Sequence, residues 1–148
     1  MPAYCKLPFF PPSVNHAYFS KGNRKILTSK GKKFKTEVKT FLAQHCPAFL
    51  GCLKPETPYT IVFNLAFEAI HTKGKTAQSR YKKIDVTNRV KLLEDALTAA
   101  GGYDDCQHMT VVASKDTAVG EDPFVEIWVF NQLDEECPID EWIGLQPR

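Results

Sequence analysis

Three aspartates and a lysine mark one segment of this 148-residue chain as a place where chemistry could occur. Asp85 precedes the segment, the pair Asp104–Asp105 follows it, and Lys91 lies between them. Carboxylate oxygens are hard ligands that suit Mg²⁺ or Mn²⁺. A lysine beside such a site can neutralise the charge that develops on a phosphate during attack. These residue types, in this order, could form a metal-dependent phosphodiesterase site.

The residues between the acidic points predict an amphipathic helix. Thr87 is the expected N-cap, and Gly101–Gly102 supply the positive φ that ends a helix after Ala100. Apolar side chains recur every three or four residues and should face a core: Val90, Leu93 and Leu97, with Ala96 and Ala100 beside them.

The opposite side of this helix carries a polar row of Asn88, Lys91 and Asp95. For the pair Asp104–Asp105 to meet Asp85, the chain must return along a helix of roughly 20 Å, at about 1.5 Å per residue. One of the pair would have to begin a strand that runs back beside Asp85. Spacing alone leaves an alternative open, in which the pair are ordinary turn residues after Gly-Gly.

Two motifs decide between these alternatives. The first runs from Lys83-Ile84-Asp85-Val86-Thr87-Asn88 through Lys91 and Asp95-Ala96-Leu97 to Gly101 or Gly102, Asp104-Asp105 and Gln107. The second is Pro11-Pro12-Ser13-Val14-Asn15 near the N-terminus. Together, in this order and in a chain of this length, they resemble the RusA family of Holliday-junction resolvases. The resemblance covers most of residues 7 to 130.

The resemblance implies a catalytic set of Asp85, Lys91 and Asp105, in which the two aspartates hold the metal. One departure matters, because Thr87 stands where the family has a second aspartate. We expect Asp104 to take the third ligand position. Reduced metal affinity or lost catalysis are the alternatives, and two other residues could also compensate: Glu94 and Asn88.

The implied activity is a structure-selective endodeoxyribonuclease that resolves four-way DNA junctions in recombination and repair. The cofactor would be Mg²⁺, with Mn²⁺ possible, and a metal-activated water would attack the phosphorus. The protein would act as a homodimer, inside the cell in the cytoplasm or nucleoid, and a phage or prophage origin is compatible with this. One alternative function is a non-catalytic branched-DNA-binding protein that lost a ligand at Thr87. Another is a nuclease that prefers flaps or replication forks.

Charge divides the chain into two unlike halves. Residues 1 to 91 carry 17 of the 19 lysines and arginines and four acids, whereas residues 92 to 148 carry two bases and 13 acids. This asymmetry predicts a basic face for a polyanion. One basic cluster runs from Lys21 to Lys39. The second cluster and two motif asparagines make up the expected DNA-binding residues: Lys73, Lys75, Arg80, Lys82, Lys83, Asn15 and Asn88.

The remaining composition indicates a single small domain. No apolar run reaches the roughly 20 residues of a membrane span, and the first residues begin no signal peptide. The five cysteines match no common zinc spacing, so we expect reduced thiols. We place a nuclease domain at residues 1–130 and an acidic C-terminal tail at 131–148.

The hydrophobic pattern predicts a mixed α/β (α+β) fold, a small mixed sheet with two main helices. A hairpin around Gly22-Asn23 should join 17–19 to 25–27, and Ser29 should cap a helix to about His45 that ends at Pro47. Residues 59–67 alternate like a half-buried strand. Further strands are expected at 108–114 and 124–130, and a mobile arm at 71–83.

Overall fold

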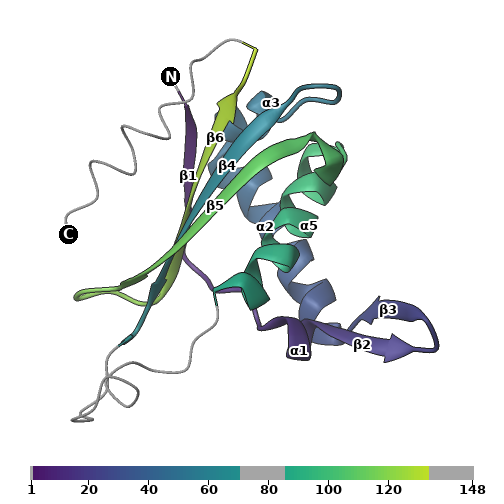
Figure 1. The fold of residues 1–148 in the computed structure, drawn as a ribbon. Coiled ribbons are helices and arrows are strands. Elements are labelled where there is room, and N and C mark those ends of the chain that lie inside the picture. The colour runs from purple at the N-terminus through teal and green to yellow at the C-terminus, as the bar shows by residue number, and fades with distance from the viewer. Residues whose placement is uncertain (1, 71–85, 134–148) are drawn as a thin grey trace.

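A computed structural model describes residues 2–70 and 86–133 of the chain. Its centre is a four-stranded mixed sheet in the order β1-β6-β4-β5 (Figure 1). The strands span Ala3–Leu7 (β1), Tyr59–Phe67 (β4), His108–Thr117 (β5) and Phe124–Asn131 (β6). Strands β4 and β5 run parallel, and β6 is antiparallel to both β1 and β4. The predicted mixed fold is confirmed.

Two long helices, α2 (Ser29–His45) and α5 (Thr87–Gly101), lie against one face of this sheet (Figure 1). The short helices are α1 (Val14–Ala17) and α3 (Pro47–Cys52). A separate hairpin of β2 (Tyr18–Lys21) and β3 (Arg24–Leu27) extends beyond the two long helices. Parallel neighbours such as β4 and β5 need a crossover connection, and α5 belongs to it.

Both long helices form where the apolar periodicity predicts them, although their first residues differ from the prediction. Thr28, not Ser29, caps α2, and its hydroxyl accepts the Gly31 N–H at 3.2 Å. Thr87 is the first residue of α5 and not its cap, because Val86 already has helical backbone angles. The buried face of α5 is wider than predicted, since one more leucine joins it: Leu92, Leu93, Ala96 and Leu97.

The prediction for the sheet contains one error and one omission. Strand β4 has the expected bounds, but it is buried on both faces, not on one. Because β4 lies between β5 and β6, side chains on its alternate side, such as Val62 and Ala66, have cross-strand neighbours on both flanking strands and are buried. Strand β1 was not predicted, and neither were the short helices α1 and α3. The strands at 108–114 and 124–130 and the hairpin are confirmed, with small extensions.

Several predicted features lie outside the described residues. They are the arm at 71–83, with Lys73, Lys75, Arg80, Lys82 and Lys83, and the first aspartate of the motif, Asp85. Most of the acidic tail at 131–148 lies outside as well.

Candidate active site

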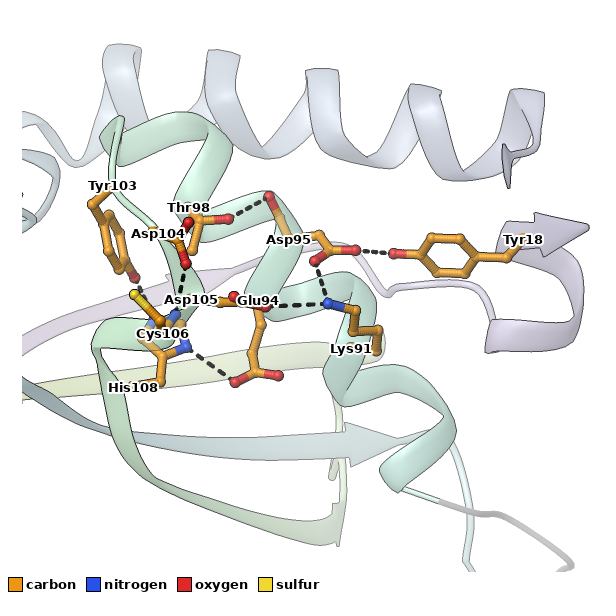
Figure 2. A network of polar contacts seen from close by, with 10 residues as sticks. All are labelled: Tyr18, Lys91, Glu94, Asp95, Thr98, Tyr103, Asp104, Asp105, Cys106 and His108. Carbon is orange, nitrogen blue, oxygen red and sulfur yellow. Dashed lines mark hydrogen bonds and ion pairs between the residues drawn. The ribbon is translucent and has the colours of Figure 1, made fainter. Parts of the chain in front are cut away.

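Lys91 occupies the second turn of α5 and contacts two carboxylates at once. Its ammonium lies 2.9 Å from Asp95 Oδ1 and 3.2 Å from Asp105 Oδ2 (Figure 2). About half of the Lys91 side chain is exposed, as is a comparable share of Asp105. The lysine and the second aspartate of the predicted catalytic set are therefore brought together by the fold, on an accessible surface.

The return of the chain toward α5 depends on how that helix ends. Gly102 adopts a left-handed conformation (φ 68°), and its N–H bonds to the Thr98 carbonyl at 2.9 Å. The N–H of Tyr103 reaches the same carbonyl at 3.2 Å, which turns the chain sharply. A short 3₁₀ turn, η1 (Asp105–Gln107), follows, and β5 begins at His108. Asp105 is therefore carried back to the level of Lys91.

Asp104, unlike Asp105, bonds to the backbone of the turn that follows it. Its Oδ1 accepts the Cys106 N–H at 2.8 Å and so caps η1. This backbone hydrogen bond, with a further contribution from the Cys106 side chain, holds the pKa of Asp104 below its usual value. Asp104 is thus an ionised turn-capping carboxylate at neutral pH.

Asp95 has both carboxylate oxygens engaged. Oδ1 pairs with Lys91, and Oδ2 accepts a hydrogen bond from the hydroxyl of Tyr18, which comes from β2 (Figure 2). About a fifth of the Asp95 side chain is exposed. A carboxylate this deeply placed needs such partners. Asp95 is therefore a fixed counter-ion for Lys91.

The pair of carboxylates sets the protonation of Lys91. The hydrogen bond to Asp95, reinforced by the one to Asp105, raises the pKa of Lys91 despite an opposing effect of partial burial. An ordinary lysine already titrates near pH 10. Lys91 is thus an ammonium ion throughout the neutral range, suited to balance negative charge and not to accept a proton.

A second polar cluster is built on Glu94, the residue of α5 next to Asp95, and it is largely buried. His108 Nδ1 lies 3.0 Å from Glu94 Oε1, and its Nε2 lies 2.7 Å from the Tyr103 hydroxyl (Figure 2). The His108 side chain is 1 % exposed. A linear pattern does not reveal this cluster, because His108 and Glu94 are 14 residues apart in the chain.

The N-terminal motif joins the same helix through an arginine that sequence reasoning missed. Arg89 donates from Nη1 to the Pro11 carbonyl. Its guanidinium lies 5.2 Å from the ring centre of Phe10 and 5.5 Å from that of Phe67. Burial lowers the pKa of Arg89. The two sequence motifs are therefore parts of one structural unit.

The expected DNA-binding residues that the structure describes lie on the accessible side. Asn15 is exposed on α1, where it lines a hollow with Tyr18, Phe19 and Lys25, and Asn88 is partly exposed on α5. Most bases of the first cluster are exposed on the hairpin and α2: Lys21, Arg24, Lys25, Lys30, Lys32, Lys33 and Lys39.

Comparison with known proteins identifies the family of this chain. The sequence model of the endodeoxyribonuclease RusA family matches residues 8–129, which include both motifs and every described residue of the site. The chain belongs to the RusA family. RusA-family proteins are endodeoxyribonucleases that resolve Holliday junctions, so nuclease, DNA-binding and recombination functions follow from membership. No individual curated protein matches the chain.

Three findings concern metal-binding groups, cysteines and membrane-spanning helices in the described part of the chain. Within residues 2–70 and 86–133, no three His, Cys, Asp or Glu side chains are grouped as a metal site. The four cysteines in this part of the chain are free thiols. None of the described helices is long and apolar enough to cross a membrane.

Proposed function

We propose that this RusA-family protein is a Mg²⁺-dependent endonuclease that cuts four-way DNA junctions, with Asp85, Lys91 and Asp105 as its catalytic residues. One observation carries the proposal: the ammonium of Lys91 lies 3.2 Å from the carboxylate of Asp105, in an accessible position. Residues 14 positions apart have been brought into contact by the return of the chain after α5.

The same contact supports a role for Asp85. Lys91 lies five residues after Val86, a separation of about 7–8 Å along a helix. Asp85 directly precedes Val86, so its position in the sequence is at the helix end nearer to Lys91. Two carboxylates, completed by phosphate oxygens and water, suit Mg²⁺. Asp104 is our candidate for a third ligand, through the carboxylate oxygen that does not cap η1.

Each residue then has a separate task. Asp85 and Asp105 would hold the ion, which when bound would supply Lewis acidity toward the phosphate. Lys91, kept charged by Asp95, would stabilise the negative charge that grows on the phosphate oxygens. The exposed bases of the hairpin and α2, with Lys73, Lys75, Arg80, Lys82 and Lys83, would hold the DNA backbone without reading its sequence. Two symmetric cuts would require a homodimer with two sites.

Cleavage of a labelled synthetic four-way junction, with and without Mg²⁺ or Mn²⁺, tests the proposal. We expect cutting by wild type that EDTA abolishes, and none by Asp85→Asn or Asp105→Asn. These variants should keep or raise their affinity for the junction, because a negative charge near the phosphates is removed. Linear duplex of the same length is the matched substrate control.

Thr87 favours a second candidate, a branched-DNA-binding protein without catalysis. A threonine hydroxyl can hold a metal through water, but it neutralises no charge. Under this alternative, wild type binds the junction and cuts it in neither metal, and Thr87→Asp restores cutting.

A further inference from the structure

The β2–β3 hairpin is fastened firmly to α2. The Thr28 N–H bonds to the Ala17 carbonyl at 2.8 Å, and the Thr28 hydroxyl bonds to the His16 carbonyl at 2.6 Å. Gly31 allows this approach, since a Cβ there would lie 2.6 Å from the Ala17 oxygen. The base of the hairpin is thus fixed on one side by backbone contacts.

Its second attachment leads to the candidate active site. Tyr18 begins β2, and its hydroxyl reaches across to Asp95 on α5. Burial, together with this hydrogen bond, raises the pKa of Tyr18, so the hydroxyl remains a donor at neutral pH. The other oxygen of Asp95 holds Lys91 at 2.9 Å. A continuous row of contacts therefore runs from the hairpin through Tyr18, Asp95 and Lys91 to Asp105 (Figure 2).

The hairpin is also suited to hold DNA. Lys21, Arg24 and Lys25 are exposed on it, and Phe19 is 48 % exposed. Beside Tyr18 lies a hollow of about 170 Å³, with Asn15 and Lys25 among its polar lining. Exposed bases next to an exposed aromatic ring fit a nucleic-acid strand, with phosphates on the bases and a base on the ring.

We propose that Tyr18 and Asp95 are positioning residues, which couple the grip of the hairpin on DNA to the placement of the Lys91 ammonium. This inference rests on the proposed function of the same site. Asp95 is mostly buried, so each of its oxygens needs a donor. Without the Tyr18 hydroxyl, Oδ2 must turn toward another donor, and Lys91 loses the fixed partner that aligns it with Asp105.

The test compares Tyr18→Phe, Asp95→Asn and the double variant with wild type. Single-turnover cleavage at saturating junction and junction affinity without metal are measured separately. We expect Tyr18→Phe to cut about tenfold more slowly, the effect of one hydrogen bond to a charged group, with affinity changed less than about twofold. The double variant should cut no more slowly than Asp95→Asn alone, since Tyr18 acts through Asp95.

Tyr4→Phe is the matched control. It removes another tyrosine hydroxyl from a carboxylate, Glu126 at 3.0 Å, between β1 and β6, and should leave cleavage unchanged. The proposal is overturned if Tyr18→Phe weakens affinity as much as rate, or if the losses multiply in the double variant. A purely structural role of Tyr18 would produce those results.

Hydrogen exchange separates this inference from the proposed function. If wild type binds the junction and does not cut it, the catalytic proposal fails while the coupling can still be measured. Junction binding should then raise amide protection both in the hairpin and around Lys91–Asp95, and in Tyr18→Phe only in the hairpin. The same protection pattern in both proteins would refute the coupling.

Discussion

Helix α5 carries two polar clusters side by side that differ chiefly in exposure. In the outer cluster, Lys91 and Asp105 are about half exposed, whereas Asp95 is mostly buried. The inner cluster of Glu94 and His108, with Tyr103, is closed, and the histidine is 1 % exposed. Both contain a carboxylate about 3 Å from a side-chain nitrogen. The difference teaches that accessibility, and not residue type, separates a group that can meet a phosphate from a group that ties a helix to a strand.

The largest effect should come from the outer cluster. Lys91→Met should lower the cleavage rate by about 10²–10³-fold, the usual loss when a group that stabilises developing negative charge is removed. Thermal stability should also fall, because the mostly buried Asp95 loses the ammonium that pairs with its Oδ1. Single-turnover cleavage and thermal melting measure the two quantities. The control is Lys6→Met. Lys6 lies on β1, at the other edge of the sheet from β5, and the change breaks its ion pair with Glu121, so cleavage should be normal.

Loss of the inner cluster should lower stability and leave catalysis nearly unchanged. His108→Ala should lower the free energy of unfolding by about 1–3 kcal/mol, because the Glu94 carboxylate and the Tyr103 hydroxyl each lose a buried partner. Below its melting temperature, the variant should keep most of its cleavage rate. Urea unfolding and cleavage at low temperature check both statements. A stable variant without activity would contradict the division between the clusters.

DNA should bind to the surface that carries the outer cluster and the β2–β3 hairpin, and not to the β1 edge of the sheet. Charge reversal of Lys21 and Lys25 should weaken binding to junction and duplex alike. The slope of log affinity against log salt should fall by roughly one for each lost phosphate contact. Lys82→Glu with Lys83→Glu should act in the same direction if the arm extends this surface. An unchanged slope would mean that these lysines only solvate the protein. Lys6→Glu on the sheet is the control.

The smallest expected effect is on the Mg²⁺ requirement, when a negative charge is added near the outer cluster. Thr87→Asp adds a carboxylate near the start of α5 and should lower the Mg²⁺ concentration for half-maximal cleavage by roughly fivefold, as expected for about 1 kcal/mol of added attraction. Cleavage across a Mg²⁺ series, repeated for Asp104→Asn, gives the measurement. If wild type cuts well and Thr87→Asp is harmful, Asp104 already fills the third position. Wild type should also respond well to Mn²⁺.

The sequence by itself determined the local structure and the family. Apolar residues at helical spacing specified α2 and α5, alternation specified β4, and Gly102 specified where α5 ends. Such features depend on neighbours in the chain, so a linear pattern contains them. The motif around Lys91 and Asp105 likewise stands in the sequence, and the family match from 8 to 129 contains it.

Tertiary structure alone decided which side chains meet. Lys91 and Asp105 are 14 residues apart, and Tyr18 and Asp95 are 77 apart, so no local pattern predicts either contact. Burial was also decided at this level. On the alternate side of β4, Val62 lies between its cross-strand neighbours Val112 and Trp128 and is buried. His108 is enclosed because Glu94 of α5 and Tyr103 contact its ring. Spacing along the chain limits what each residue can reach, whereas the packing of helices on the sheet determines which polar groups keep their water and can meet DNA.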